Sequence, residues 1–373
     1  MDALMLPLNW QKVRLGDIGK PCMCKRVMKH QTTRYGEIPF YKIGTFGNTA
    51  DAFISKKLFL EYRTKYSFPK KGDILISASG TIGRAVIYDG KPAYFQDSNI
   101  VWIDNDETLV KNDFLFYAYS NVKWNTEHTT ILRLYNDNFR NTLIPLPPLN
   151  EQSTIANILS ALDRYLYALD ALILKKKSVK KALSFELLSQ RKRLKGFNQA
   201  WQRVRLGDIA NYLTSNLSVE QITQQGKIKV YDVNNFIGYT DTTFISDKPY
   251  ISIVKDGSVG RVRILPPKTN ILSTMGALIA NHRTTTEFLF YLLSNFDFKN
   301  FTSGSIIPHI YFKDYKEKTI FLPPLNEQIA IANILSTLDN EITSLKNKKR
   351  QFENIKKALN HDLMSAKIRV LKK

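Results

Sequence analysis

The chain has 373 residues, of which 43% are hydrophobic and 12% aromatic, so it can form two or three domains with their own cores and is not a disordered polypeptide. It carries 54 Lys and Arg against 33 Asp and Glu, a formal charge of +21. That charge favours binding to nucleic acid or to an anionic membrane surface, and merely solvated lysines are the alternative explanation.

The first predicted domain covers residues 1–149 and opens on WQKVRLGDI, Trp10–Ile18. Its start, MDALMLPLNW, lacks the pattern of a signal peptide. The stretch GDILISASGTIGRAVIYDG has β-rich flanks around a Ser/Gly turn and predicts a hairpin. The later stretch ETLVKNDFLFYAYSN predicts an amphipathic helix. We therefore expect a mixed α+β domain.

Two cysteines, Cys22 and Cys24, are the only ones in the chain. Two ligands do not complete a zinc site, and a disulfide between residues this close would be strained. We expect reduced thiols and a cytoplasmic protein.

The phrase LPPLNEQ ends the first domain at Leu146–Gln152, and a helical pattern over residues 150–196 follows it. Leu-Pro-Pro favours an extended approach, and Asn150 suits the N-cap, with Glu151 at the positive end of the helix dipole. Gly196 is the predicted stop signal. Apolar residues then recur at spacings of three and four, as in a coiled-coil seam: Ile155, Leu159, Leu162, Leu166, Leu169 and Ile173.

The second half of the chain repeats this order, with a domain over residues 197–325 and a helix over residues 326–373. WQRVRLGDI and LPPLNEQIAIANILSTLD match the first half closely, and Asn326 and Glu327 repeat the helix start. DGSVGRV at Asp256–Val262 is only a weak echo of SGTIGRA at Ser79–Ala85, and the first half carries about 14 extra residues between Ser55 and Gly80.

Each half thus has constant edges and a variable middle, which suggests one scaffold that presents two different binding surfaces. A tandem duplication whose middles drifted is the alternative, and the near-identity of the edges argues against it. The two apolar stripes match, so we expect the helices to pack on each other, antiparallel; packing on another subunit is also compatible. The lysine runs that follow are read as a solvated helix face rather than as direct DNA contacts.

Motifs for catalysis are missing from the sequence. It has no G-x-x-x-x-G-K-[ST] phosphate loop, no Asn/Asp-Pro-Pro-aromatic arrangement, no nuclease carboxylate pair and no metal-ligand spacing among its five histidines. These absences favour a binding protein over an enzyme.

The layout of variable domain, PLPPLNEQ and long helix, written twice, resembles the specificity subunit of type I restriction–modification systems. The W-x-x-V-x-L-G-D-I openings and the SGTIGR turn are also similar to that family, across the whole chain. The resemblance implies an α+β fold with two mixed α/β target recognition domains. Two long helices, paired as an antiparallel coiled coil, join these domains, and the internal repeat is pseudo-two-fold.

The resemblance also implies a subunit without catalysis or cofactor of its own. It would bind double-stranded DNA, with each domain reading one half of a bipartite target through the major groove and the helices setting the gap. Two modification subunits would carry S-adenosylmethionine, restriction subunits would carry ATP and Mg²⁺, and no membrane would be involved. Rival readings are a related type II specificity subunit, an enzyme in its own right and a coiled-coil adaptor.

Candidate DNA contacts lie in the central turns and in the loops that differ between the halves. A turn-forming or capping role is the alternative for each Ser and Asn. Arg84 and Arg261 occupy equivalent places and are expected to hold phosphate or structure, while Gln152 and Gln328 are assigned to docking of the partner subunit. The predicted DNA-binding residues are Ser77, Ser79, Thr81, Arg84, Gln96, Arg133, Asn234, Asn235, Tyr239, Lys255, Ser258, Arg261, Ser303, Ser305 and His309.

Overall fold

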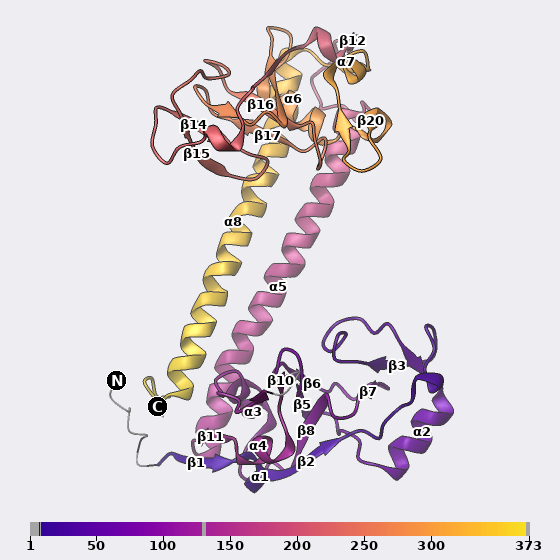
Figure 1. The fold of residues 1–373 in the computed structure, drawn as a ribbon, viewed down its shortest axis with the longest axis vertical. Helices are drawn as coiled ribbons and strands as arrows, with labels where there is room; N and C mark the ends of the chain where they lie inside the picture. Colours follow the sequence, from indigo (N-terminus) through magenta and orange to yellow (C-terminus); the bar gives the residue numbers. More distant parts are fainter. Residues whose placement is uncertain (1–6, 8, 129–131, 371–373) are drawn as a thin grey trace. The chain divides into compact units, whose positions relative to one another are not determined.

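A computed structural model describes residues 7, 9–128 and 132–370 of the chain (Figure 1). The chain divides into two compact units. Unit 1 comprises residues 1–169 and 348–373, and unit 2 comprises residues 170–347. Each unit therefore holds one predicted recognition domain together with part of both long helices.

Unit 1 is built around a four-stranded antiparallel sheet with the strand order β2-β8-β5-β6. A second sheet has the order β4-β3-β7, and β1 pairs with β11 where the domain begins and ends. The strands are β1 (Gln11–Arg14), β2 (Gly19–Met23), β3 (Ile38–Tyr41), β4 (Phe53–Ile54), β5 (Ile74–Ser77), β6 (Ala85–Ile87), β7 (Tyr94–Phe95), β8 (Ile100–Asn105), β9 (Glu127–His128), β10 (Leu132–Arg133) and β11 (Leu143–Leu146). The helices are α1 (Leu15–Ile18), η1 (Lys29–Gln31), α2 (Lys56–Lys65), α3 (Asn112–Tyr119) and α4 (Asn136–Asn141).

Unit 2 repeats this plan, with sheets ordered β13-β19-β16-β17 and β15-β14-β18 and with β12 paired to β22. Its strands are β12 (Gln202–Arg205), β13 (Ala210–Thr214), β14 (Ile228–Tyr231), β15 (Phe236–Thr240), β16 (Tyr250–Val254), β17 (Val262–Leu265), β18 (Asn270–Ile271), β19 (Met275–Ala280), β20 (Thr302–Ser303), β21 (His309–Ile310) and β22 (Thr319–Leu322). Its shorter helices are η2 (Leu206–Asp208), η3 (Val219–Gln221), α6 (Thr286–Ser294), η4 (Lys299–Phe301) and α7 (Phe312–Tyr315).

The predicted hairpin and amphipathic helix of the first half are confirmed as β5–β6 and α3, and the second half repeats them as β16–β17 and α6. Helix α2 lies in the stretch where the first half carries its extra residues, between Ser55 and Gly80. The fold class predicted from the repeat is therefore correct in both units.

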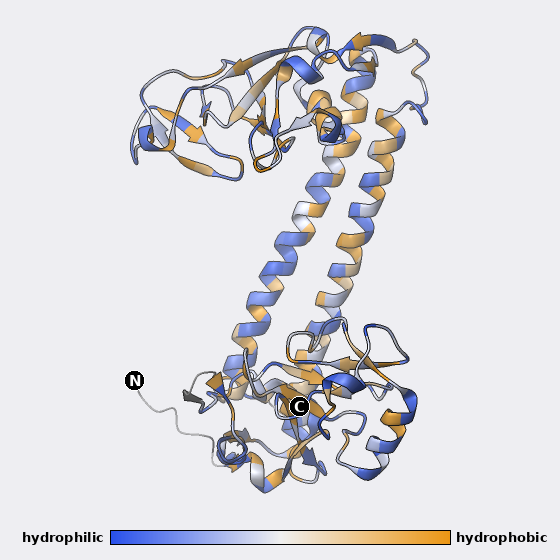
Figure 2. Ribbon diagram, turned by 45° about the vertical axis from the view of Figure 1, so that its right-hand side comes forward, coloured by the Kyte–Doolittle hydropathy of each residue, from blue (hydrophilic) through white to orange (hydrophobic). Residues whose placement is uncertain are grey.

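Two helices of 40 residues each follow the recognition domains, α5 (Leu149–Leu188) and α8 (Leu325–Met364). At about 1.5 Å per residue each is about 60 Å long. Hydrophobic residues recur among hydrophilic ones along both helices (Figure 2). Further along the helices, the predicted seam is buried at Leu169 and Ile173 on α5 and at Ile342 on α8. Near the helix starts, Ile155 and Leu159 are buried in the core of the first recognition domain, and Ile331 and Leu335 in that of the second.

The helices run antiparallel within each unit, as expected. In unit 1 the ring of Tyr165 lies 4.7 Å from the ring of Phe352, between centroids, and Asp163 pairs with Lys356. In unit 2 Lys176 pairs with Glu341 at 2.6 Å. Higher residue numbers on α5 thus meet lower numbers on α8.

The predicted helix boundaries need correction. Helix α5 begins at Leu149, so Asn150 is already inside the helix, and the amides of Glu151 and Gln152 both donate to the Pro148 carbonyl at 2.9 Å. The helix ends at Leu188 rather than at Gly196. The chain turns earlier, at Gln190, which has a φ of 61°.

Candidate nucleic-acid interface

The central hairpin of each recognition domain ends in the same tight turn, although the turn sequences differ. In unit 1 the Gly83 amide donates to the Ser77 carbonyl at 2.9 Å. In unit 2 the Gly260 amide donates to the Val254 carbonyl at the same distance. Both glycines have positive φ, 81° and 79°, which favours glycine at these positions. One backbone frame therefore presents two different sets of side chains.

An aromatic ring packs under each of these turns. A Cβ at Gly83 would lie 2.0 Å from Nε1 of Trp124, and a Cβ at Gly260 would lie 2.5 Å from Cδ2 of Phe298. The glycines therefore also permit the close packing of the turn on its own domain. The aromatic ring therefore supports the turn on the side that faces its own domain.

A second loop joins each turn, and it is the loop that differs most between the halves. In unit 1 Ser79 forms a β-bridge with Arg133, and the Leu134 amide donates to the Ala78 carbonyl at 2.9 Å. In unit 2 Asp256 bridges to His309 in the same way. The structure thus brings together turn and loop residues that were predicted separately.

A third segment lies against the arginine of each turn. Nη2 of Arg261 donates to Oδ1 of Asn234 at 2.9 Å. In unit 1 a Cβ at Gly47 would lie 3.1 Å from Nη2 of Arg84, so this guanidinium packs on the backbone of the corresponding loop. The two arginines occupy equivalent places, as predicted, and both side chains are exposed.

Three predicted DNA contacts form hydrogen bonds within their own domain, and two of them, Ser77 and Ser79, are buried. Ser77 is 2% exposed, and its hydroxyl accepts from the Arg84 amide at 2.9 Å and contacts the Thr81 carbonyl. Ser79 is 6% exposed and donates to Oδ1 of Asn99 at 2.7 Å. Gln96 accepts from the Ile43 amide at 2.9 Å. Ser77 and Ser79 are buried and shape the turn, so their prediction as DNA contacts is corrected. Gln96 is part-buried, and its role in DNA binding stays a prediction.

The other predicted side chains reach the surface to different degrees. His309 is part-buried, with Nδ1 2.7 Å from Oδ1 of Asp256. Arg133, Tyr239 and Lys255 are half-buried. The exposed predicted residues are Thr81, Arg84, Asn234, Asn235, Ser258, Arg261, Ser303 and Ser305.

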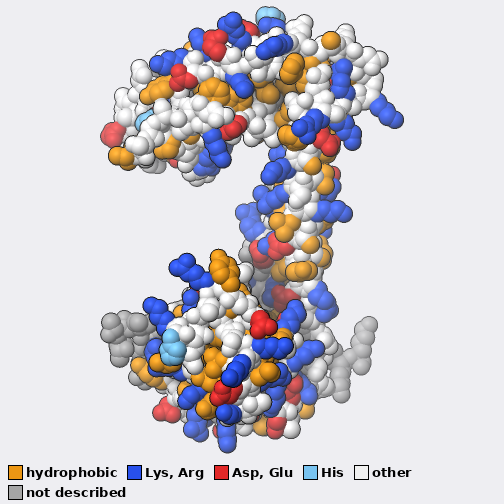
Figure 3. All heavy atoms as spheres, turned by 90° about the vertical axis from the view of Figure 1, so that its right-hand side faces the viewer, with side chains coloured by type: hydrophobic (Ala, Val, Ile, Leu, Met, Phe, Trp, Pro, Cys, Tyr) orange, Lys and Arg blue, Asp and Glu red, His pale blue; other side chains and the backbone are white. Residues whose placement is uncertain are grey.

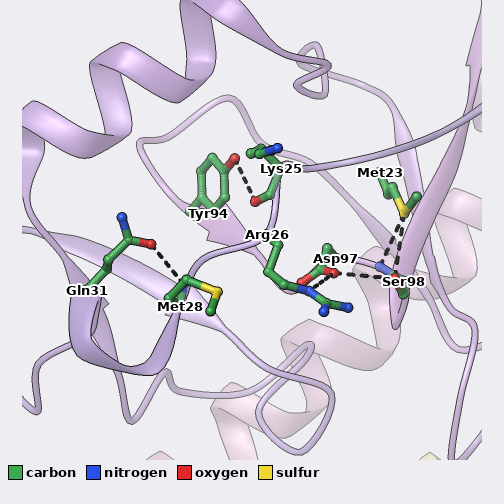
Figure 4. Close-up of polar contacts among 8 residues, drawn as sticks. All are labelled: Met23, Lys25, Arg26, Met28, Gln31, Tyr94, Asp97 and Ser98. Atoms are coloured by element: carbon green, nitrogen blue, oxygen red, sulfur yellow. Dashed lines mark hydrogen bonds and ion pairs between the residues drawn. The ribbon is translucent and has the colours of Figure 1, made fainter.

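The structure adds Arg26 to this surface, a residue that carried no motif in the sequence. Nε of Arg26 donates to Oδ2 of Asp97 at 2.8 Å, and Ser98 follows with a φ of 58° (Figure 4). The next residue, Asn99, accepts the hydrogen bond from Ser79. Arg26 is thus tied to the segment that supports the turn of unit 1. Arg26 stands among other basic residues in the sequence, so no sequence pattern could have distinguished it from them.

Lys and Arg side chains are more numerous than Asp and Glu over the face shown in Figure 3. Among the residues that the structure describes, no three His, Cys, Asp or Glu side chains gather as a metal site would need. In the same part of the chain, no helix is both long and apolar enough to span a membrane. The surface chemistry is that of a site for polyanions.

A family model described as "Type I restriction modification DNA specificity domain" matches the chain twice, over residues 7–177 and 198–354. The chain belongs to this family of DNA specificity subunits. The two matches coincide with the two halves of the internal repeat.

Curated proteins with similar sequences are described as specificity subunits of the same kind. A putative type I restriction enzyme specificity subunit from Haemophilus influenzae is 61% identical over 152 residues, which is 40% of this chain and 40% of that protein. The MjaVIII specificity subunit from Methanocaldococcus jannaschii is 26% identical over 99% of this chain and 95% of its own length. The putative MjaX specificity subunit from the same organism is 29% identical over 98% and 95%.

Solved structures show the same fold. A type I restriction–modification S subunit from M. genitalium has a TM-score of 0.63 with 20% identity, over 96% of this chain and 98% of that one. A chain from a structure of type I complex assembly has a TM-score of 0.58 with 17% identity, over 96% and 98%. The likeness covers nearly the whole chain.

The two glutamines assigned to partner docking lie inside the specificity subunit. Gln152 and Gln328 are both 0% exposed. Nε2 of Gln328 donates to the carbonyls of Arg283 at 3.0 Å and Pro323 at 2.8 Å, and its Oε1 accepts from the Thr285 amide at 3.1 Å. Neither side chain offers a surface to a partner, so the docking assignment is corrected: they lock the helix start to the recognition domain.

Gln152 makes the equivalent contacts in unit 1. Its Oε1 accepts from the Lys111 amide at 2.8 Å, and its Nε2 donates to the carbonyls of Leu109 and Pro147, both at 2.9 Å. A glutamine amide has two donors and an acceptor, and the junction uses both kinds of group.

The glutamate before each glutamine is also engaged. Oε2 of Glu327 accepts from the Trp201 indole at 2.9 Å and pairs with Arg193 at 2.6 Å. In unit 1 Trp10 donates to Glu151 at 3.1 Å, and Arg369 pairs with the same carboxylate. The repeated LPPLNEQ phrase and the repeated tryptophan therefore meet at each junction, which explains why both are kept in the two halves.

Proposed function

We propose that each recognition domain of this subunit reads one half of a bipartite, asymmetric site on double-stranded DNA through the major groove. The main supporting observation is that one turn frame exposes Thr81 in the first domain and Ser258 in the second, within turns of different sequence. A non-specific DNA binder has no use for two different reading surfaces on one frame. Exposed Arg84 and Arg261 suit phosphate contacts, which position the domain without specifying a base.

The long helices suit two further roles in the proposed complex. Their 40-residue length would set the unspecified gap between the half-sites, and their outer faces would dock two modification subunits. Restriction subunits would join through that complex. Catalysis would belong to the partners, which would carry S-adenosylmethionine, ATP and Mg²⁺, and the complex would act in the cytoplasm. Relatives described as type I do not favour the type II alternative.

Methylation sequencing of a host that expresses this chain with its modification subunits tests the proposal. We expect a bipartite motif with methylated adenine and two unlike halves. A palindromic motif, or no motif, would contradict it. Methylation or cleavage of DNA by the purified chain alone would contradict the division of labour between subunits.

Exchange of one recognition domain gives a second, independent test. Replacing residues 1–149 with the corresponding domain of a relative should change one half-site and leave the other half-site and the gap intact. A change in both halves would mean that the two domains do not read independently.

A further inference from the structure

Two neighbouring isoleucines of the second recognition domain are exposed to solvent, in the loop between β20 and β21. Ile306 is 93% exposed and Ile307 is 55% exposed. Apolar side chains gain stability from burial, so a single exposed one is unremarkable, whereas two adjacent ones at a loop tip mark a contact surface.

A backbone hydrogen bond ties the loop that carries them to the central turn of its own domain. Gly304 has a φ of 90°, and a Cβ there would lie 2.3 Å from the Ile307 carbonyl oxygen. The Gly257 amide, in the turn between β16 and β17, donates to the Pro308 carbonyl at 2.9 Å. The isoleucines are therefore presented on a fixed support, which lowers the entropic cost of a contact through them.

The elements that adjoin this loop carry basic residues, and the Lys255 carbonyl accepts from the amide of Ile310, at the end of the loop, at 2.9 Å. Lys255 and Arg261 belong to the adjoining turn, and Nζ of Lys313 lies 5.5 Å from the centroid of the Tyr311 ring. The carboxylate of Asp256, which would repel an anion, is engaged by His309 at 2.7 Å. The ligand of the tip must therefore offer a small apolar group close to negative charge.

We propose that Ile306 and Ile307 contact the 5-methyl groups of thymine in the second half-site, an inference that rests on the proposed function. Thymine is the base that presents a methyl group in the major groove, and phosphates flank it on either side. A protein partner fits less well, because specific interfaces bury about 800 Å² on each side, far more than two side chains supply. The tip would thus help to specify a base rather than only anchor the domain.

Uracil tests the contact directly, because it differs from thymine by the methyl group alone. Once the target is known, duplexes are made in which each thymine of the second half-site is replaced in turn by uracil. Binding is measured for the full chain assembled with its modification subunits. At one position or more we expect about four-fold weaker binding, the factor expected for one buried methyl group.

The same replacement should have less than about two-fold effect on a complex that carries Ile306→Ala and Ile307→Ala, because the partner of the methyl group is gone. Ile87→Ala, at an exposed isoleucine of the first recognition domain, is the matched control and should keep the full uracil effect. Circular dichroism and the single variant Ile306→Ala guard against an effect of misfolding.

Three results would overturn the inference: a second half-site without thymine on either strand, native binding that tolerates every uracil, or a double variant as sensitive to uracil as the native chain. Each of these leaves a bipartite target in place. Failure of the proposed function is a different result, since the native complex would then show no bipartite target.

Discussion

Lys180 on α5 and Asp339 on α8 form a close ion pair, with Nζ 2.6 Å from Oδ1 and 2.7 Å from Oδ2. The hydroxyl of Tyr291, from α6 of the recognition domain, donates to the same carboxylate at 2.9 Å, and Nζ of Lys180 lies 5.4 Å from the ring centroid. One carboxylate therefore ties the recognition domain to both long helices of unit 2.

The same cluster recurs in unit 1. Tyr117 donates to Asp163 at 2.8 Å, Lys356 pairs with that carboxylate, and its Nζ lies 5.5 Å from the Tyr117 ring centroid. Burial, together with the hydrogen bond to the carboxylate, raises the pKa of Tyr117, and the pKa of Tyr291 is raised for the same reasons. Each tyrosine therefore stays a hydrogen-bond donor throughout the physiological pH range.

Breaking this cluster should cost measurable stability. We expect Lys180→Met and Asp339→Asn each to lower the free energy of unfolding by about 1–2 kcal/mol, because each leaves a part-buried polar partner unmatched. The double variant should lose less than the sum, with a coupling of about 1 kcal/mol in a urea-unfolding cycle. Lys181→Met, at the exposed neighbour, should stay within about 0.5 kcal/mol of the native chain. Additive losses would show that the pair does not act as a unit.

Gln328 gives a sharper test of the helix junction. Gln328→Leu keeps the size of the side chain but leaves the carbonyls of Arg283 and Pro323 without a donor, and the Thr285 amide without an acceptor. We expect a loss of about 3 kcal/mol in the free energy of unfolding. Gln351→Leu, on the exposed face of α8, is the control. A variant with native stability that no longer bound the modification subunit would restore the docking assignment.

Local periodicity and the internal repeat predicted most of the fold. The spacing of three and four residues that continues through Leu169 and Ile173 predicts a buried seam because a helix brings such positions to one face, and both side chains are buried. The constant frame around variable centres predicts two domains of one kind. Both the periodicity and the repeat can be seen in the order of residues along the chain, so they could be predicted without knowledge of any tertiary contact.

Contacts between distant segments could not be predicted in the same way. Ser77 and Thr81 are both small hydroxyl residues of the same predicted turn, so the sequence does not distinguish them. Ser77 is nevertheless buried in the turn, and Thr81 is exposed. Gln96 is committed to the Ile43 amide, 53 residues away, and no spacing rule shows this. Arg26 pairs with Asp97, 71 residues away, which places it beside the segment that supports the turn of unit 1. Which polar side chains stay exposed therefore depends on tertiary contacts between distant segments, and the sequence does not show these contacts.

The two glycines of the first turn should respond differently to the same change. A Cβ at Gly83 would meet the Trp124 ring at 2.0 Å, whereas the nearest atom at Gly80 is Cγ1 of Ile43 at 3.9 Å. Both have positive φ, so Gly80→Ala should cost about 1 kcal/mol from backbone strain alone. Gly83→Ala should cost about 3 kcal/mol or more because a steric clash adds to that strain. Equal losses in urea unfolding would contradict the packing of the turn.

The two thiols should differ in reactivity. Burial raises the pKa of Cys24 to about 12, and burial also raises the pKa of Cys22, which is partly accessible. At pH 8 we expect slow alkylation of Cys22 by iodoacetamide and almost none of Cys24, measured by mass spectrometry. The pKa of each thiol is higher in the folded than in the unfolded chain. The contribution of the two thiols to the free energy of unfolding is therefore complete below the unfolded pKa, about 8.5, and falls as the pH rises above it. Cys22→Ser is the control, and rapid alkylation of Cys24 in that variant would contradict its burial.

Insertion of one heptad into both long helices tests their role as the spacer. Seven residues placed after Asp170 in α5 and after Asn347 in α8 preserve the seam, because the apolar pattern repeats every seven residues. Each helix becomes about 10 Å longer, so the gap between half-sites should grow by about three base pairs. Methylation sequencing should then show the same two half-sites further apart.

A two-residue insertion at the same points is the control for that experiment. It turns the apolar stripe by about 200°, away from the partner helix. The helices then cannot bury their stripes against each other, so we expect an unstable subunit and no methylation. Heptad insertion that altered either half-site, or that left the gap unchanged, would show that the helices do not measure the distance. The spacing would then have to come from the modification subunits that are proposed to dock on them.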